Sequence, residues 1–255
     1  VGYALDSAGL GACLVLQVGR IVIYVLVPGA WAGGWVWDAI AVRLCRLGHA
    51  VHQMTLPGLE KGECAEKVHL NTHVNAVMDY LVSHELNDVV LVGHSYSGIV
   101  VGQVSARLQH RVAHCVFIEA FLPVAGKSML EVSGLDVTHE KQLIDDNGGL
   151  WPAPTLEELK SQPGLSDEWV NLLLTRQKGH PGKTVTEPAV MVGSLDNLSA
   201  TFISDAGWLN SSPEADLVAA LRKQDSWHFK TVNGGHWPML TLPGEITMLL
   251  DELGT

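Results

Sequence analysis

The sequence predicts an α/β protein with a doubly wound, mostly parallel sheet and an inserted helical cap. Apolar runs of strand length alternate with amphipathic stretches of helical period, as in sheets whose parallel strands are joined by helices. One of these runs leads directly into a Gly-x-Ser-x turn around Ser95. From about residue 120 to 198 the alternation stops, and Gly and Pro become frequent. A chain of 255 residues suits a single domain over 1–255, with this segment as the insertion.

The strands are expected at short apolar runs. The run that begins at Ile21 is continuous, which is typical of a central strand buried on both faces of a sheet. A further strand over 11–17 is expected to join it through a turn at 18–20, and residues 1–10 carry no usable signal. The sheet strands are therefore expected at 21–27, 50–55, 89–92, 112–118, 200–204 and 228–232.

The helices are indicated by apolar spacing and by capping residues. One begins near Trp35 and ends at Gly48, because glycine readily takes the left-handed conformation that closes a helix. Asn71 or Thr72 can cap the next helix, and another follows Ser95. A capping box, an N-cap serine and two prolines mark later helix starts at Thr155, Ser166, Pro213 and Pro243.

The composition narrows the classes of partner. A formal charge of -11 argues against nucleic acid and anionic membranes, since both would repel the chain. The apolar stretch 10–27 is interrupted by polar residues and follows no basic leader, so neither a signal peptide nor a membrane helix is expected. The assembly state is left open, with a homodimer as one option. No close cysteine pair indicates a disulfide or a zinc knuckle, so free thiols in a cytoplasmic protein are expected at Cys13, Cys45, Cys64 and Cys115.

Ser95 is the candidate nucleophile. The β-branched run before it, the Gly93-to-Gly98 turn and the apolar start of a helix behind it form a strand–turn–helix context. In such an elbow small residues allow strand and helix to approach, and the serine hydroxyl is raised above the sheet edge. Ser97 stands where the motif usually has its last glycine, and serine is small enough to fit.

His236 is the candidate base, because a serine hydroxyl is a weak nucleophile until an imidazole accepts its proton. It lies in a loop just after the last expected strand, on the same sheet edge as Ser95, and two glycines precede it. A third group must orient the imidazole. Glu119 and Asp205 both end apolar strands, and both fit the chain order of nucleophile, acid and histidine.

Other residues complete the expected site. The backbone N–H groups of Ala30 and Tyr96 are placed to form an oxyanion hole. His94, inside the turn, is expected to pack or bond locally. His69 and His73 could share a helix face, but no third ligand is evident, so neither a metal nor another cofactor is expected. A substrate pocket lined by apolar side chains is expected from Trp31, Phe121, Met129, Trp151 and Trp169.

Three segments of the sequence resemble the α/β-hydrolases, and in particular plant methylesterases, hydroxynitrile lyases and their bacterial esterase relatives. They are residues 25–31, the 93–98 turn and the Gly235–Leu240 segment, and the resemblance extends over about residues 21–253. It implies an α/β-hydrolase fold. Glu119-Ala120-Phe121-Leu122-Pro123 is similar to a segment that carries the acid in some bacterial relatives, which favours Glu119 over Asp205. The relatives usually have His before the oxyanion glycine, where this chain has Pro28.

The expected function is that of a serine hydrolase that cleaves a carboxylic ester or lactone of a small apolar substrate through an acyl-enzyme. Hydroxynitrile lyase activity is the first alternative. The resemblance argues against it, since such relatives carry Thr in place of Gly29 and Lys in place of Trp237. A ligand receptor without turnover is the second alternative, and the set of Ser95, His236 and an acid argues against it.

Overall fold

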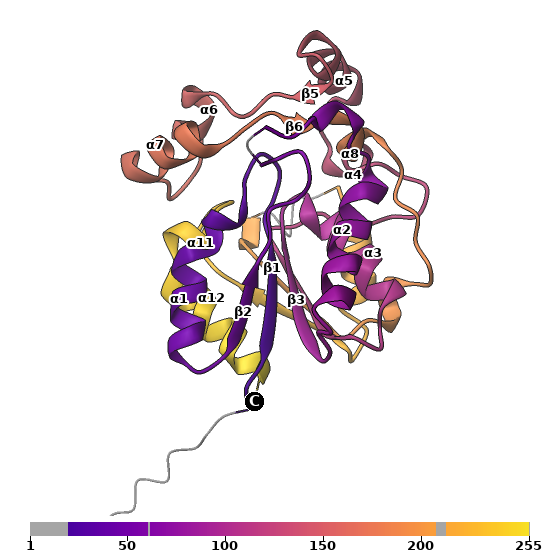
Figure 1. Cartoon of the computed structure of the whole chain (residues 1–255), viewed down its shortest axis with the longest axis vertical. Helices are drawn as coiled ribbons and strands as arrows, with labels where there is room; N and C mark the ends of the chain where they lie inside the picture. Colours follow the sequence, from indigo (N-terminus) through magenta and orange to yellow (C-terminus); the bar gives the residue numbers. More distant parts are fainter. Residues whose placement is uncertain (1–19, 61, 208–212, 255) are drawn as a thin grey trace, which may run out of the picture.

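The computed structural model describes residues 20–60, 62–207 and 213–254. Within these ranges one parallel sheet has the strand order β2-β1-β3-β4-β7-β8 and carries helices on both faces (Figure 1). The predicted fold class is confirmed. The expected strand at 11–17 lies outside the described residues. The sheet strands are β1 (Ile23–Val27), β2 (Ala50–Gln53), β3 (Val89–His94), β4 (Val112–Ile118), β7 (Ala200–Ser204) and β8 (Trp227–Thr231).

Two helical layers bury the sheet. One layer comprises α1 (Asp38–Arg46), α11 (Pro238–Thr241) and α12 (Pro243–Asp251). The other comprises α2 (Leu70–Ser83), α3 (Ser97–Arg107) and α10 (Ala215–Leu221). Short 3-10 helices occur at η1 (Gly34–Trp37), η2 (Ala65–Lys67), η3 (Leu195–Asn197) and η4 (Glu252–Gly254).

Strand β1 is apolar throughout because each face of the sheet has its own core. In β1, Val25 and Val27 pack with α2 and α3, whereas Tyr24 and Leu26 pack with α1 and α12. Successive side chains of a strand point to opposite faces, so a strand between two helical layers needs apolar residues at every position. The continuous run at residues 21–27 reflects this requirement.

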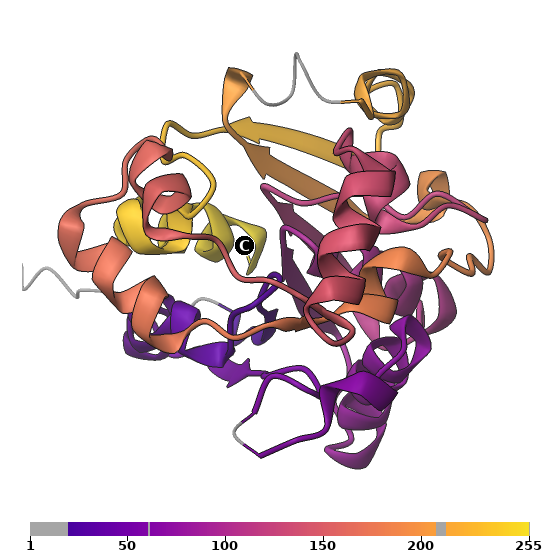
Figure 2. The ribbon, with the colours of Figure 1, turned by 90° about the horizontal axis from the view of Figure 1, so that it is seen from above.

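The segment between β4 and β7 lies over the carboxyl edge of the sheet (Figures 1 and 2). Its two short strands pair antiparallel and form the β5–β6 ribbon, in which Trp151 lies opposite His180. Thr155 and Ser166 cap helices α6 and α7 as expected, through hydrogen bonds from Glu158 N and Trp169 N. The segment contains α4 (Met129–Ser133), α5 (Val137–Asp146), β5 (Leu150–Trp151), α6 (Leu156–Ser161), α7 (Asp167–Arg176), β6 (His180–Pro181) and α8 (Gly182–Thr186).

Helix α2 begins earlier than expected. Its N-cap is His69, and neither Asn71 nor Thr72 has that position. Thr72 instead accepts a hydrogen bond from the backbone of His69, and the Glu187 carboxylate accepts one from Leu70 N at 3.0 Å. The carboxylate that satisfies the helix start is 117 residues away in the chain, so the local sequence could not indicate it.

Other expected boundaries move by a few residues. Strand β1 begins at Ile23, β2 ends at Gln53, and β8 spans Trp227–Thr231. Helix α10 begins at Ala215 rather than Pro213, and the side chain of its N-cap, Glu214, accepts a hydrogen bond from Leu122 N. Gly48 does take the left-handed conformation after α1, with φ 95°.

None of the helices within 20–60, 62–207 and 213–254 has the length and apolarity that a bilayer-spanning helix needs.

We expect Gly98→Ala to destabilise the fold, because α3 passes very close to the chain that follows β4. A Cβ atom at Gly98 would lie 2.3 Å from the carbonyl oxygen of Phe121 and 2.8 Å from Cβ of Ala120. Overpacking of this kind costs about 1–3 kcal/mol, which urea denaturation would measure as a lower midpoint.

Gly244→Ala is the matched control. Gly244 is also the second residue of a helix, but among the described residues no atom outside its own helix backbone and chain neighbours lies within 4 Å of the position of its Cβ. Alanine should therefore leave the free energy of unfolding unchanged or raise it slightly. Equal midpoints for the two variants would contradict the close approach at Gly98.

Candidate active site

Ser95 lies in the turn between β3 and α3, where the backbone is strained. Its φ is 53°, a left-handed value that is uncommon for a residue other than glycine. Backbone hydrogen bonds hold it there: Ser95 N donates to Ile118 O at 3.1 Å, and Ser95 O accepts from Gly98 N and Phe121 N. Only 6% of the residue is exposed. The strain persists because three neighbouring segments fix the turn.

Glycines allow these segments to meet. A Cβ at Gly29 would lie 2.7 Å from Nδ1 of His94 and 2.9 Å from Cβ of Ser95. A Cβ at Gly93 would lie 2.5 Å from a methyl group of Val101 on α3. The loop after β1, the strand and the helix therefore pack backbone to backbone around Ser95, and Gly29 has no room for a larger residue.

Ser97, the departure from the usual motif, has a structural use. It is fully buried, and its Oγ lies 2.9 Å from the carbonyl oxygens of both Val27 and His94 and accepts from His94 N. Through this hydroxyl the turn is joined to the end of β1, just before the Gly29 loop.

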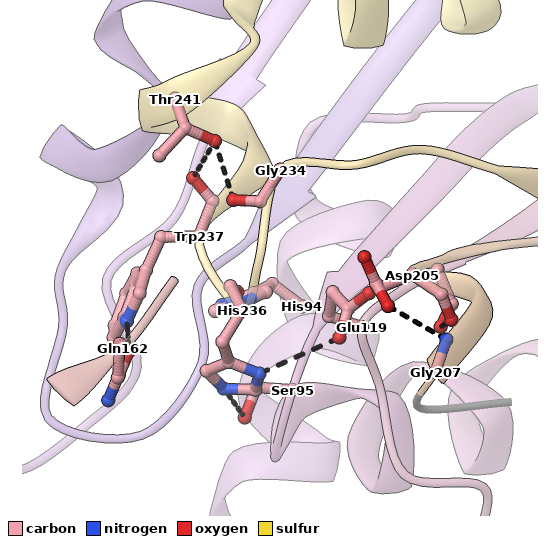
Figure 3. Close-up of polar contacts among 11 residues, drawn as sticks. His94, Ser95, Glu119, Gln162, Asp205, Gly207, Gly234, His236, Trp237 and Thr241 are labelled. Carbon is pink, nitrogen blue, oxygen red and sulfur yellow. Dashed lines mark hydrogen bonds and ion pairs between the residues drawn. The ribbon is translucent and has the colours of Figure 1, made fainter. Parts of the chain in front are cut away.

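His236 meets the nucleophile. Its Nε2 lies 3.0 Å from Oγ of Ser95 (Figure 3). The preceding Gly235 has φ 64°, and a Cβ there would lie 2.2 Å from the carbonyl oxygen of Pro163, so only glycine fits. The His236 carbonyl accepts a hydrogen bond from Nε2 of His94 at 2.7 Å. The loop is thus held on both sides of the imidazole.

Glu119, and not Asp205, faces the imidazole. Glu119 Oε2 lies 3.9 Å from Nδ1 of His236, an ion-pair distance that is too long for a hydrogen bond (Figure 3). Asp205 is used differently: its backbone N–H donates to Oε1 of Glu119, and its Oδ1 accepts from Gly207 N at 2.8 Å. The Asp205 backbone therefore helps to hold Glu119, and its side chain closes the turn after β7. Glu119 itself has φ 46°, a second strained position at the site.

The two backbone N–H groups expected to form an oxyanion hole flank the nucleophile. Ala30 and Tyr96 both line the same cavity as Ser95. Within the described residues neither N–H donates to another protein group, so both are free to donate to a ligand. Buried donors without a partner are rare in folded proteins.

The loop that carries Ala30 is held by the cap. Trp31 has φ 63°, and three hydrogen bonds join it to the β5–β6 ribbon and to Lys178, two residues before β6. Trp31 N donates to Nδ1 of His180 at 3.3 Å, Trp31 Nε1 donates to Trp151 O at 3.1 Å, and Lys178 N donates to Trp31 O at 3.1 Å. These bonds join the loop that carries Ala30 to the cap.

Buried neutral histidines surround the turn. Burial lowers the pKa of His73 to about 4 and holds the pKa values of His94 and His180 well below the usual range. Neutral His73 donates from Nε2 to Pro57 O at 2.8 Å, so its Nδ1 accepts from the Tyr96 hydroxyl at 2.8 Å. His69, the other histidine of that pair, contacts Glu187. Among the described residues no group of three His, Cys, Asp or Glu side chains could hold a metal ion.

A cavity of about 720 Å³ opens above Ser95 and His236. Four of the expected side chains line it: Trp31, Phe121, Met129 and Trp151. The expectation for Trp169 is wrong. Its ring packs on the α1–α12 side of the molecule, because α7 lies beside the sheet edge rather than over the nucleophile. Glu140 and Glu158 also line the cavity, and no motif in the sequence indicates this position for either.

This arrangement suits acyl transfer. A serine hydroxyl next to a neutral imidazole can lose its proton as the oxygen attacks a carbonyl carbon. Two backbone N–H groups on the same cavity wall can then bind the alkoxide that forms. The carboxylate behind the imidazole stabilises the imidazolium.

Comparisons with known proteins agree with this chemistry. Residues 24–247 match the alpha/beta hydrolase family. A carbendazim hydrolyzing esterase of Nocardioides sp. (strain SG-4G) is 30% identical over 245 residues, which cover 91% of this chain and 99% of that protein. Methylesterase 10 of Arabidopsis thaliana is 31% identical over 103 residues, 39% of this chain and 38% of that protein.

A solved structure has the same fold. The extracellular alpha/beta-hydrolase from a Paenibacillus species superposes with a TM-score of 0.78 at 21% sequence identity, and the match covers 91% of this chain and 98% of that one.

We expect Glu119→Gln to lower the kcat for a p-nitrophenyl ester far more than Asp205→Asn does. Gln removes the charge that stabilises the imidazolium and allows the wrong tautomer, an effect of up to about 10⁴-fold in a serine protease. Asn at 205 keeps the backbone N–H that holds Glu119. A small loss of kcat in Glu119→Gln and a large loss in Asp205→Asn would identify Asp205 as the acid instead.

His180→Ala should lower kcat with little change in KM for a small acetate ester. The loss of the acceptor for Trp31 N loosens the loop that carries Ala30, and oxyanion contacts form only in the transition state. Removing an oxyanion donor outright costs about 100-fold or more, so the loss should stay below that. His180→Asn, which retains an acceptor, should recover part of the rate. Unchanged kcat in a folded His180→Ala would show that the ribbon does not position the loop.

Proposed function

Because the chain belongs to the alpha/beta hydrolase family, we propose that it is a serine carboxylic ester hydrolase. The observation that carries this proposal is the 3.0 Å contact between Nε2 of His236 and Oγ of Ser95, at a strained elbow beneath a cavity. A full-length relative named as an esterase supports ester hydrolysis as the general reaction.

The reaction runs in two halves. Ser95 Oγ attacks the ester carbonyl carbon as His236 Nε2 takes its proton, and the N–H groups of Ala30 and Tyr96 bind the resulting oxyanion. The tetrahedral intermediate collapses, the C–O bond to the alcohol breaks, and His236 gives its proton to the leaving alcohol. Water then attacks the acyl-enzyme in the same way and releases the acid and Ser95.

A small apolar ester or lactone is the proposed substrate class. The cavity of about 720 Å³ falls within the range of small-molecule sites, and Trp31, Phe121, Met129 and Trp151 give it an apolar wall. The relative from Nocardioides is named for carbendazim, which belongs in a first substrate panel.

The two alternative functions are less well supported. The hydroxynitrile lyases that this chain resembles carry Thr in place of Gly29 and Lys in place of Trp237. Here a Cβ at Gly29 would meet His94 and Ser95, and Trp237 is buried with its Nε1 bonded to Gln162 at 2.8 Å. A receptor without turnover would have no need of a strained serine in contact with a histidine.

The test is covalent labelling followed by turnover. A fluorophosphonate should phosphonylate Oγ of Ser95 with loss of fluoride, as found by peptide mass mapping, and should abolish hydrolysis of p-nitrophenyl esters and lactones. Ser95→Ala should remove both the label and the activity. Label on another residue with Ser95 untouched, or binding of esters without turnover, would overturn the proposal.

A further inference from the structure

Two carboxylates lie at the wall of the substrate cavity. Glu140 of α5 and Glu158 of α6 line the cavity, and no Lys or Arg is among the described residues that do. None of the ion pairs of the described residues involves either carboxylate. The chain as a whole carries a formal charge of -11. A cleft lined by charge of one sign concentrates ligands of the opposite sign.

Each carboxylate is held by one oxygen and leaves the other available. Glu140 Oε2 accepts from Nε1 of Trp151 at 2.6 Å. Glu158 Oε2 accepts from the backbone and hydroxyl of Thr155 at 2.7 and 2.8 Å. Within the described residues Oε1 of neither side chain has a hydrogen-bond partner, so a ligand or solvent must satisfy it. The hydrogen bonds to Oε2 also fix where the two charges lie.

An aromatic pair lies beside the carboxylates. The rings of Trp31 and Trp151 have centroids 4.3 Å apart at an interplanar angle of 42°, and both line the cavity. Both indole N–H groups already donate within the protein. The rings therefore offer a ligand only their π-systems, which attract planar groups and cations.

We propose that the cavity selects aromatic esters that carry a positive charge and rejects those that carry a negative one. This inference rests on the proposed function, because it assigns the substrate class of the Ser95 site. A cationic group gains from both carboxylates and from the indole faces. A carboxylate or sulfonate would meet like charge, with no Lys or Arg among the described lining residues to pair with.

The test uses three acetates of similar shape and different charge: 3-(trimethylammonio)phenyl, 3-tert-butylphenyl and 3-carboxyphenyl acetate. Each is compared across variants, so differences in chemical reactivity between the esters cancel. In Glu140→Gln/Glu158→Gln the ratio of kcat/KM for the cationic to the neutral ester should fall about 10-fold, and the anionic-to-neutral ratio should rise by a similar factor. Gln keeps an acceptor for Trp151 and for the capping box, so the change isolates charge.

Glu157→Gln is the matched control. Glu157 is on the same helix as Glu158 but does not line the cavity. This variant loses the same negative charge and should leave both ratios unchanged. Raised salt should narrow the preference of the natural protein, because exposed charges are screened. Unchanged ratios in the double Gln variant, or an equal shift in Glu157→Gln, would overturn the inference.

Calorimetry separates this inference from the proposed function. The phenols released from the three esters should bind in the order cationic, neutral, anionic, whether or not the protein turns esters over. That order without fluorophosphonate label on Ser95 would sustain the charge preference and reject the hydrolase. Label on Ser95 together with equal dissociation constants for the three phenols would support the hydrolase and reject the charge preference.

Discussion

The site depends on the close backbone approach at Ser95. The Gly29 loop, the β3–α3 turn and the chain after β4 meet there with no room for a Cβ at Gly29, Gly93 or Gly98. Because the neighbouring segments fix the turn, Ser95 stays at a φ of 53° and its hydroxyl remains within reach of His236. The conformational energy stored in the turn is balanced by the packing of the two helical layers on β1, β3 and β4.

Burial gives this arrangement its electrostatic character. His73, His94 and His180 are fully buried, and desolvation keeps all three imidazoles neutral, so each acts as a directed donor or acceptor without adding charge next to His236. Among the described residues, the carboxylates of the site lie in two places. Glu119 lies behind the imidazole, and Glu140 and Glu158 lie at the cavity wall. In the proposed enzyme, chemistry at Ser95 and selection in the cavity thus depend on separate charges.

Local sequence signals predicted the sheet, the elbow and the histidine loop, because each follows from residues that are neighbours in the chain. Glu119 could not be separated from Asp205 in that way, since both end strands and only their tertiary positions differ. The start of α2 depends on Glu187, and the support of the oxyanion loop depends on His180, each more than a hundred residues from its partner. Trp169 was misplaced because the order of the cap helices does not reveal which of them crosses the sheet edge.

Because three hydrogen bonds join Trp31 to the cap, the cap and the loop that carries Ala30 move together. A motion large enough to lift the β5–β6 ribbon from Trp31 would also displace Ala30. A chimera that takes its cap from a relative would inherit a ribbon shaped for a different loop, and its loss of rate would extend even to substrates that the new cap admits. If residues 28–31 are exchanged together with the cap, the loop and the β5–β6 ribbon come from the same protein and still fit each other.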